Sequence, residues 1–249
     1  MLYTPKWLFS LGLLSLSLLI GCSSTDTIDT STAEGAYKLA QSYEKDERYE
    51  EAIIYFREVK NKHPYSRFAT DAELAVADIQ FKREAFAEAE ISYRLFKELH
   101  PSHAKMDYVT YRLGMSIFNQ KPGTIDRDLT LLNKAIIYFD EVMTSFSQSS
   151  FAKEAKKRKL EAQKMLAEKE IYIADWYFGQ KEWLSSLGRY EDLLGKHGRL
   201  GFDKRALYGA AVAAYRSNEQ GKARSYLQKL KERFGDSSEY SDAKKELGR

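Results

Sequence analysis

The sequence has little cysteine, proline or glycine, and each shortage excludes a class of structure. Cys22 is the single cysteine among 249 residues, so neither an intrachain disulfide nor a CxxC metal or redox site can form. Four prolines and fourteen glycines are few for an all-β fold. The formal net charge of +3 gives no reason to expect a nucleic-acid partner. We therefore expect a helical protein that binds no nucleic acid.

Motifs for catalysis and cofactors are missing as well. The sequence contains no GxSxG, no GxGxxG and no P-loop pattern. Its four histidines show no HExxH spacing, and His63 and His100 each precede a proline in successive repeat units. We expect no enzyme activity, no cofactor and no metal site. The basic run 153–159 is interpreted as a solvated helix face, with a protein partner or an anionic membrane as the alternatives.

The N-terminus has the pattern of an export signal. Lys6 precedes an apolar stretch over residues 7–20, which is too short and too rich in serine to cross a bilayer. The stretch ends in Leu19-Ile20-Gly21-Cys22, which matches a lipobox: small residues permit cleavage and the thiol accepts the lipid. We predict a cleaved signal peptide over 1–21, then an acylated Cys22 and a flexible tether over 22–33 that anchor the chain to a membrane.

Small residues recur at a fixed interval through the remaining chain. Ala40, Ala77 and Gly114 are 37 positions apart, and so are Ala174 and Ala211. In four of these five cases a second small residue, then a large one and then a proline or glycine follow at constant offsets. This pattern is typical of the tetratricopeptide repeat, in which two antiparallel helices meet at small residues. The predicted fold is all-α, a superhelix (α-solenoid) of about five helix-turn-helix repeats.

The predicted repeats differ in length. Repeats one and two fill 34–103, and repeat three spans 105–150 with an insertion around Lys121-Pro122-Gly123. Repeats four and five fill 152–236, and a charged helical stretch is expected to lengthen the first helix of repeat four. Residues 237–249 are expected to form a short polar helix or a frayed tail.

The concave side of such a superhelix is lined by its first helices, on which positions 2, 5, 9 and 12 share one face. We predict a groove for an extended peptide there, made of aromatic, apolar and charged side chains. A second interpretation stays open, in which Leu74, Phe81 and Phe118 belong to the core between repeats. The predicted groove residues are Tyr37, Gln41, Leu74, Asp78, Phe81, Tyr108, Arg112 and Met115.

Several stretches resemble the BamD (ComL) family, lipoproteins of the outer-membrane β-barrel assembly (BAM) machine. The insertion in repeat three is similar to the family pattern, and the resemblance covers nearly the whole mature chain. Gly188 and Gly198 depart from that pattern, which concerns partner contacts and not the fold. The most specific stretches are His100-Pro101-Ser102-His103 with Asp107-Tyr108-Val109-Thr110-Tyr111 and Gly114, and Tyr172-Ile173-Ala174-Asp175-Trp176-Tyr177 with Trp183 and Arg189.

The resemblance implies a non-enzymatic scaffold, lipid-anchored on the periplasmic face of the outer membrane. Members bind the POTRA domains of BamA through C-terminal repeats, where Arg189 and Trp183 are expected to face BamA. The N-terminal repeats receive unfolded outer-membrane β-barrel proteins, and other BAM lipoproteins are further partners. The alternative is another tetratricopeptide lipoprotein, such as a pilotin for secretin or type IV pilus assembly, which shares the lipobox and the repeats.

Overall fold

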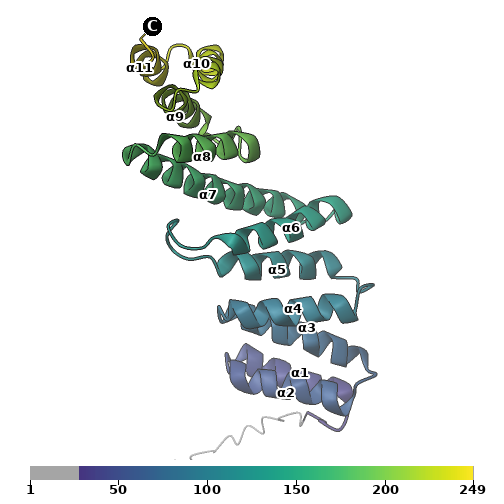
Figure 1. The fold of residues 1–249 in the computed structure, drawn as a ribbon. Helices are drawn as coiled ribbons and strands as arrows, with labels where there is room; N and C mark the ends of the chain where they lie inside the picture. The colour runs from purple at the N-terminus through teal and green to yellow at the C-terminus, as the bar shows by residue number, and fades with distance from the viewer. Residues whose placement is uncertain (1–27, 249) are drawn as a thin grey trace, which may run out of the picture.

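Consecutive helices pack against one another and stack into an elongated superhelix (Figure 1). The computed structural model describes residues 28–248, so the predicted signal peptide, Cys22 and the first part of the tether lie outside the described residues. Within this range no helix is both long and apolar enough to cross a bilayer. The helices are α1 (Ala33–Lys45), α2 (Tyr49–Lys62), α3 (Arg67–Lys82), α4 (Phe86–Leu99), α5 (Met106–Asn119), α6 (Thr130–Ser145), α7 (Ala152–Gly179), α8 (Trp183–Lys196), α9 (Asp203–Arg216), α10 (Gln220–Phe234) and α11 (Ser238–Glu246).

The repeated small residues lie where paired helices approach most closely. Ala40, Ala77, Ala174 and Ala211 are completely buried. At Gly114 an added Cβ would lie 2.9 Å from the Phe139 ring, closer than carbon atoms pack without displacement. These buried small residues, together with the order of the helices, confirm the predicted all-α tetratricopeptide fold.

The turns inside the repeats have one recurring backbone conformation. Glu47, Glu84, Lys181 and Asn218 each follow the first helix of a repeat and have φ between 58° and 67°. This left-handed conformation ends a helix and reverses the chain within a few residues. Repeat three lacks such a residue because its insertion joins α5 to α6 by a longer loop.

Buried side chains form three hydrophobic clusters, and α7 belongs to two of them. The N-terminal cluster holds Phe56 and Ile79 from repeats one and two. The central cluster extends from α3 to the first half of α7, which contributes Ala155 and Ala162. The C-terminal cluster begins with Ile171 in the second half of α7 and continues through α11. The long helix therefore closes one core and opens the next.

The insertion of repeat three is fixed to this long helix. Lys169 of α7 donates a hydrogen bond to the backbone carbonyl of Arg127, and Leu129 is buried at the end of the loop. At the C-terminus, α11 packs against α9 and α10 and buries Ala243. The described chain thus ends in a packed helix.

Candidate functional site

Four predicted groove residues surround one hollow in repeats two and three. Asp78 and Phe81 are on α3, Tyr108 and Arg112 are on α5, and Glu44 reaches the hollow from α1. The space has a volume of about 510 Å³. Because α1, α3 and α5 are the first helices of their repeats, the hollow lies on the side that a superhelix of this type curves around.

The Asp78 carboxylate is held by two tyrosine hydroxyls. Tyr93 of α4 donates to Asp78 Oδ1 at 2.5 Å, and Tyr108 of α5 donates to the same oxygen at 2.7 Å. Burial, strengthened by the charge of Asp78, raises the pKa of Tyr93. Burial and the hydrogen bond to Asp78 raise the pKa of Tyr108 to about 12. Both hydroxyls therefore remain protonated donors at neutral pH, and they fix the carboxylate between three helices.

Arg112 uses only part of its hydrogen-bonding capacity in this network. Its Nε donates to the Tyr93 hydroxyl at 3.2 Å, and its guanidinium carbon lies 3.5 Å from the centre of the Phe81 ring. Burial opposes its charge, but the tyrosines and Asp78 outweigh this effect and raise the pKa of Arg112. Within residues 28–248 the guanidinium forms no ion pair. Its terminal N–H groups are thus free to bind a carboxylate in the hollow.

The remaining predicted groove residues do not line this hollow. Tyr37 packs against Phe56, with ring centres 5.2 Å apart, and Gln41 is exposed on α1. Met115 is half-buried against the central cluster. The prediction for Leu74 is wrong, because its side chain is only 3% exposed and belongs to the core between repeats.

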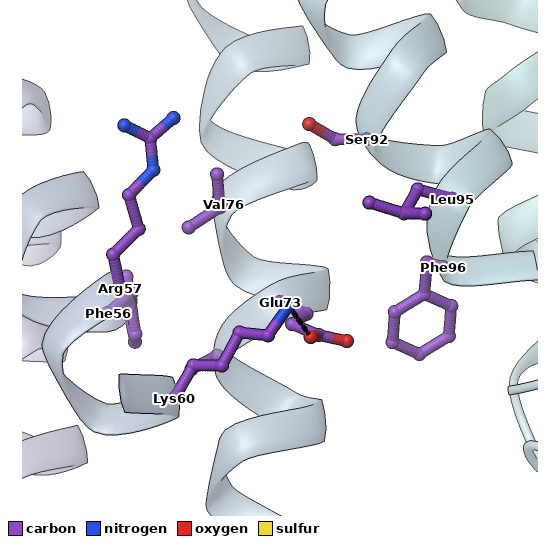
Figure 2. A pocket seen from close by; sticks show the side chains of 9 residues that line it. Phe56, Arg57, Lys60, Glu73, Val76, Ser92, Leu95 and Phe96 are labelled. Carbon is purple, nitrogen blue, oxygen red and sulfur yellow. Dashed lines mark ion pairs between the residues drawn. The ribbon is translucent and has the colours of Figure 1, made fainter. Parts of the chain in front are cut away.

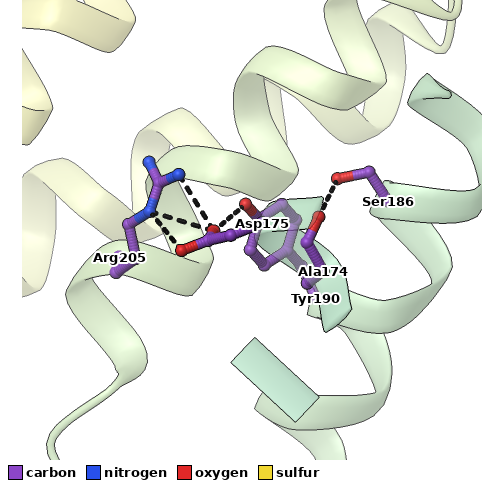
Figure 3. Close-up of polar contacts among 5 residues, drawn as sticks. All are labelled: Ala174, Asp175, Ser186, Tyr190 and Arg205. Atoms are coloured by element: carbon purple, nitrogen blue, oxygen red, sulfur yellow. Dashed lines mark hydrogen bonds and ion pairs between the residues drawn. The ribbon is translucent and has the colours of Figure 1, made fainter. Parts of the chain in front are cut away.

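A second network, in repeats four and five, contains an aspartate and a tyrosine at equivalent positions (Figure 3). Tyr190 of α8 donates to Asp175 Oδ1 of α7 at 2.5 Å. Arg205 of α9 binds the same carboxylate through Nε, at 3.1 and 3.3 Å from its two oxygens, and through Nη2 at 2.9 Å. Beside it, Ser186 donates to the Ala174 carbonyl at 3.1 Å and ties α8 to α7. Here the arginine is already paired with the chain's own aspartate.

The two residues predicted to face BamA lie near this second network. Arg189 pairs with Glu170 of α7 at 3.3 Å and keeps a side chain that is 42% exposed. Trp183 is half-buried, and its ring meets Phe178 edge-on at 5.3 Å. Arg189 is therefore accessible to a partner, whereas much of Trp183 is used to hold α8 on α7.

Exposed aromatics on α7 were missed by the sequence interpretation of the site. Tyr172 and Trp176 are one helical turn apart and both half-exposed. Trp176 is 55% exposed, but Ile79, which has the equivalent place in α3, is completely buried. An aromatic residue at a position that is elsewhere core was the signal that could have identified this surface.

The basic run is partly neutralised by its own helix and by α6. Arg158 pairs with Glu154 and Glu161 at 3.0 Å each, and Lys159 with Asp140 at 2.5 Å. No group of three or more potential metal ligands occurs in the part of the chain that the structure describes. The accessible groups described above are charged and aromatic side chains, Arg189 and Trp176 among them.

Comparisons with known structures return tetratricopeptide proteins. The TPR2AB domain of yeast Sti1 in complex with pHSP90 has a TM-score of 0.43 and 15% identity, covering 85% of this chain and 83% of its own. The type IV pilus biogenesis factor PilW has a TM-score of 0.34 and 16% identity, covering 84% of this chain and 97% of its own.

Sequence comparisons are more specific. Residues 205–237 match the tetratricopeptide repeat family, and residues 29–199 match a family described as outer membrane lipoprotein (YfiO). The outer membrane protein assembly factor BamD of Vibrio cholerae is 26% identical over 73% of this chain and 80% of its own length. BamD of Neisseria meningitidis is 25% identical over 74% of this chain and 76% of its own. The chain belongs to the outer membrane lipoprotein (YfiO/BamD) family of assembly factors.

Proposed function

We propose that this chain is a scaffold and substrate receptor in the assembly of outer-membrane β-barrel proteins, with no catalytic step of its own. A lipid on Cys22 holds it at the periplasmic face of the outer membrane. The hollow between α3 and α5 receives part of an unfolded barrel protein. The surface of α7 and α8 contacts the POTRA region of BamA, and other BAM lipoproteins complete the assembly.

The observation that carries the receptor role is the state of Arg112. Phe81 and the Tyr93 hydroxyl fix the guanidinium in place, yet its terminal N–H groups have no acidic partner within residues 28–248. A preorganised arginine on an aromatic floor suits an extended segment with a carboxylate and an aromatic side chain. The arginine loses little conformational entropy on binding because it is already ordered.

This role can be tested with a fluorescent peptide that has the sequence of the last strand of an outer-membrane barrel protein. Fluorescence anisotropy would measure its affinity for the purified chain. We expect Arg112→Ala to weaken binding by at least about tenfold, since the cation stacked on Phe81 is lost. Arg94→Ala is the matched control, because Arg94 is an exposed arginine that does not line the hollow. Equal affinity of both variants would exclude Arg112 as a substrate contact.

The partner surface is supported by different residues. Arg189 has an accessible guanidinium, and Tyr172 and Trp176 add exposed aromatic area on the neighbouring helix. Aromatic residues and arginine are enriched where protein interfaces have their largest binding contributions. We therefore propose that the BamA contact includes Arg189 of α8 and the exposed aromatic side chains of α7.

Co-purification of the acylated protein tests this placement. We expect Arg189→Glu to reduce recovery of BamA, while Lys196→Glu, an exposed charge reversal on the same helix, leaves it unchanged. Undiminished recovery with Arg189→Glu would remove this arginine from the interface. Recovery of a secretin in place of BamA would favour the pilotin alternative.

Depletion in cells tests the function as a whole. If the chain is a general receptor, its loss should lower the amounts of all outer-membrane β-barrel proteins together, as measured by quantitative proteomics of the outer membrane. Normal barrel levels after depletion would contradict the proposal.

A further inference from the structure

A second hollow lies between α2 and α4 and has α3 as its floor (Figure 2). Phe56, Val76 and Phe96 give it an apolar base, and Arg57 and Leu95 stand on opposite walls. Its volume is about 200 Å³. Because α2 and α4 are the second helices of their repeats, this space opens on the other layer of the superhelix from the hollow around Arg112.

Exposed aliphatic side chains lie on the two helices that form the walls of this hollow. Ile91, Leu95 and Leu99 follow one another at every fourth position of α4, and Ile54 has the place equivalent to Ile91 on α2. Each is between 47% and 57% exposed. Single exposed aliphatic residues are ordinary, but a row beside an apolar hollow marks a surface that another chain covers.

The neighbouring groove, between α4 and α6, shows what closes such a space. There Lys97 of α4 forms an ion pair with Glu141 of α6. The equivalent residues one groove earlier are Lys60 and Leu95, so the acid is replaced by a leucine. Lys60 pairs instead with Glu73 on the floor (Figure 2). The α2–α4 groove therefore has no bridge of this kind and exposes Leu95.

The charges of the groove indicate the sign of its partner. Glu73 is the single acid among the described lining residues, and it is already occupied by Lys60 and by His100, whose Nε2 lies 2.6 Å away. Arg57 is exposed and forms no ion pair with any described residue. One positive charge is thus left at an apolar groove, which favours a ligand with a carboxylate beside its apolar side chains.

The surroundings favour a protein over a membrane surface. Two parallel walls with aliphatic residues spaced by four match the ridges of a third helix.

We propose that the α2–α4 groove binds an amphipathic helix of a partner protein, one with aliphatic residues on one face and acidic residues beside them. The aliphatic face covers Ile54, Ile91, Leu95 and Leu99, and an acidic residue pairs with Arg57. This is the helix-in-groove mode of recognition, in which residues at i, i+4 and i+7 insert into the groove.

A designed peptide tests this proposal on the full chain. The probe is a fluorescent helical peptide of about 18 residues with leucines at i, i+4 and i+7 and glutamates beside them, and a scrambled peptide of equal composition is its control. We expect Leu95→Glu, which restores the ion pair with Lys60, to weaken binding by at least about tenfold. Arg57→Glu should weaken the glutamate peptide and favour a version with lysines in place of the glutamates.

Two variants separate the groove from general effects of surface hydrophobicity. Ile91→Ser should weaken binding, whereas Leu184→Ser, which removes a still more exposed leucine on α8, should not. The melting temperatures of all variants in circular dichroism should be the same, because every substituted residue is exposed. The three aliphatic residues are at least 47% exposed, and Arg57 is exposed too.

Three outcomes would overturn the proposal. The first is equal binding of the scrambled peptide, and the second is unchanged affinity of the Leu95→Glu variant. The third is that the chain self-associates in sedimentation, or binds vesicles with anionic lipids, and that Ile91→Ser abolishes this binding. The last two readouts would assign the groove to a second copy of this chain or to a membrane.

Discussion

The same aspartate–tyrosine pair occurs twice in the molecule, once in repeats two and three and once in repeats four and five. The two regions differ in how the neighbouring arginine is used. Asp78 with Tyr93, and Asp175 with Tyr190, are equivalent along the chain and are bonded at the same 2.5 Å. In the C-terminal network Arg205 neutralises Asp175 directly. In the N-terminal network Tyr108 stands in the place of Arg205 and holds Asp78 without neutralising it.

A second exchange completes the difference. Arg112 corresponds in position to Gly209, and an added Cβ at Gly209 would lie 2.2 Å from the Tyr190 ring. In the C-terminal network the arginine is therefore part of the ion pair with Asp175. A glycine stands at the position where the N-terminal network has Arg112 over Phe81. Two substitutions separate a network that stabilises the fold from one that leaves a cation available to a ligand.

The largest expected effect is at the position that differs most. Gly209→Ala should lower the free energy of unfolding by about 3 kcal/mol, because the completely buried Tyr190 ring cannot move away from the added methyl group. Arg112→Ala, at the equivalent position, should cost less than about 1 kcal/mol, since a stacked and partly solvated cation is removed. Urea unfolding followed by circular dichroism measures both, and equal costs would contradict the comparison.

Removing the tyrosine hydroxyls should have the next largest effect. We expect Tyr93→Phe and Tyr190→Phe each to cost about 1.5–2 kcal/mol, the usual value of a hydrogen bond to a charged group. Tyr93→Phe should cost more, because Arg112 also loses its bonding partner, whereas Arg205 continues to bind Asp175. The same urea experiment ranks the two variants, and the reverse order would show that the ion pair depends on Tyr190.

An exchange of residues should convert the open network into the closed one. In the double variant Tyr108→Arg with Arg112→Gly, the new arginine is expected to pair with Asp78 as Arg205 pairs with Asp175. Binding of the barrel-strand peptide should fall about tenfold, with little change in the urea midpoint. Unaltered peptide affinity in a folded double variant would separate substrate binding from the free guanidinium.

The last expected effect is confined to alkaline pH. The pKa of Tyr108 is about 12 in the folded chain and near 10 when unfolded, so the folded state holds the proton more tightly. Its contribution to stability is complete below pH 10 and is lost as the pH rises toward 12. Tyr108→Phe should therefore make the unfolding free energy fall less steeply between pH 10 and 12. An unchanged slope would mean that the Tyr108 hydroxyl is neither buried nor bonded to Asp78 in solution.

Spacing predicted the fold because tetratricopeptide packing depends on a few small residues at fixed intervals. The same periodicity selected Asp78, Phe81, Tyr108 and Arg112, since residues that share a helix face meet in one hollow. It failed for Leu74, because a small rotation of α3 decides whether this position faces solvent or the core. Periodicity alone does not fix that rotation.

Other parts of the site depend on contacts between residues far apart in sequence. Tyr93 was not selected because it lies on a second helix, and only the packed structure shows its hydroxyl passing between helices to Asp78. The sequence did not predict the α2–α4 groove either. This groove differs from the next one by Leu95, which stands where the α4–α6 groove has Glu141. Such differences appear in the sequence only after the repeats have been aligned in space.

The shared helix α7 has a mechanical consequence. At 1.5 Å per residue its 28 residues extend about 42 Å, and they belong to both the central and the C-terminal core. A sharp bend between the two cores would have to interrupt the hydrogen bonds of this helix. The helix thus joins the central core, beside which the hollow around Arg112 lies, to the C-terminal core through one continuous hydrogen-bonded element.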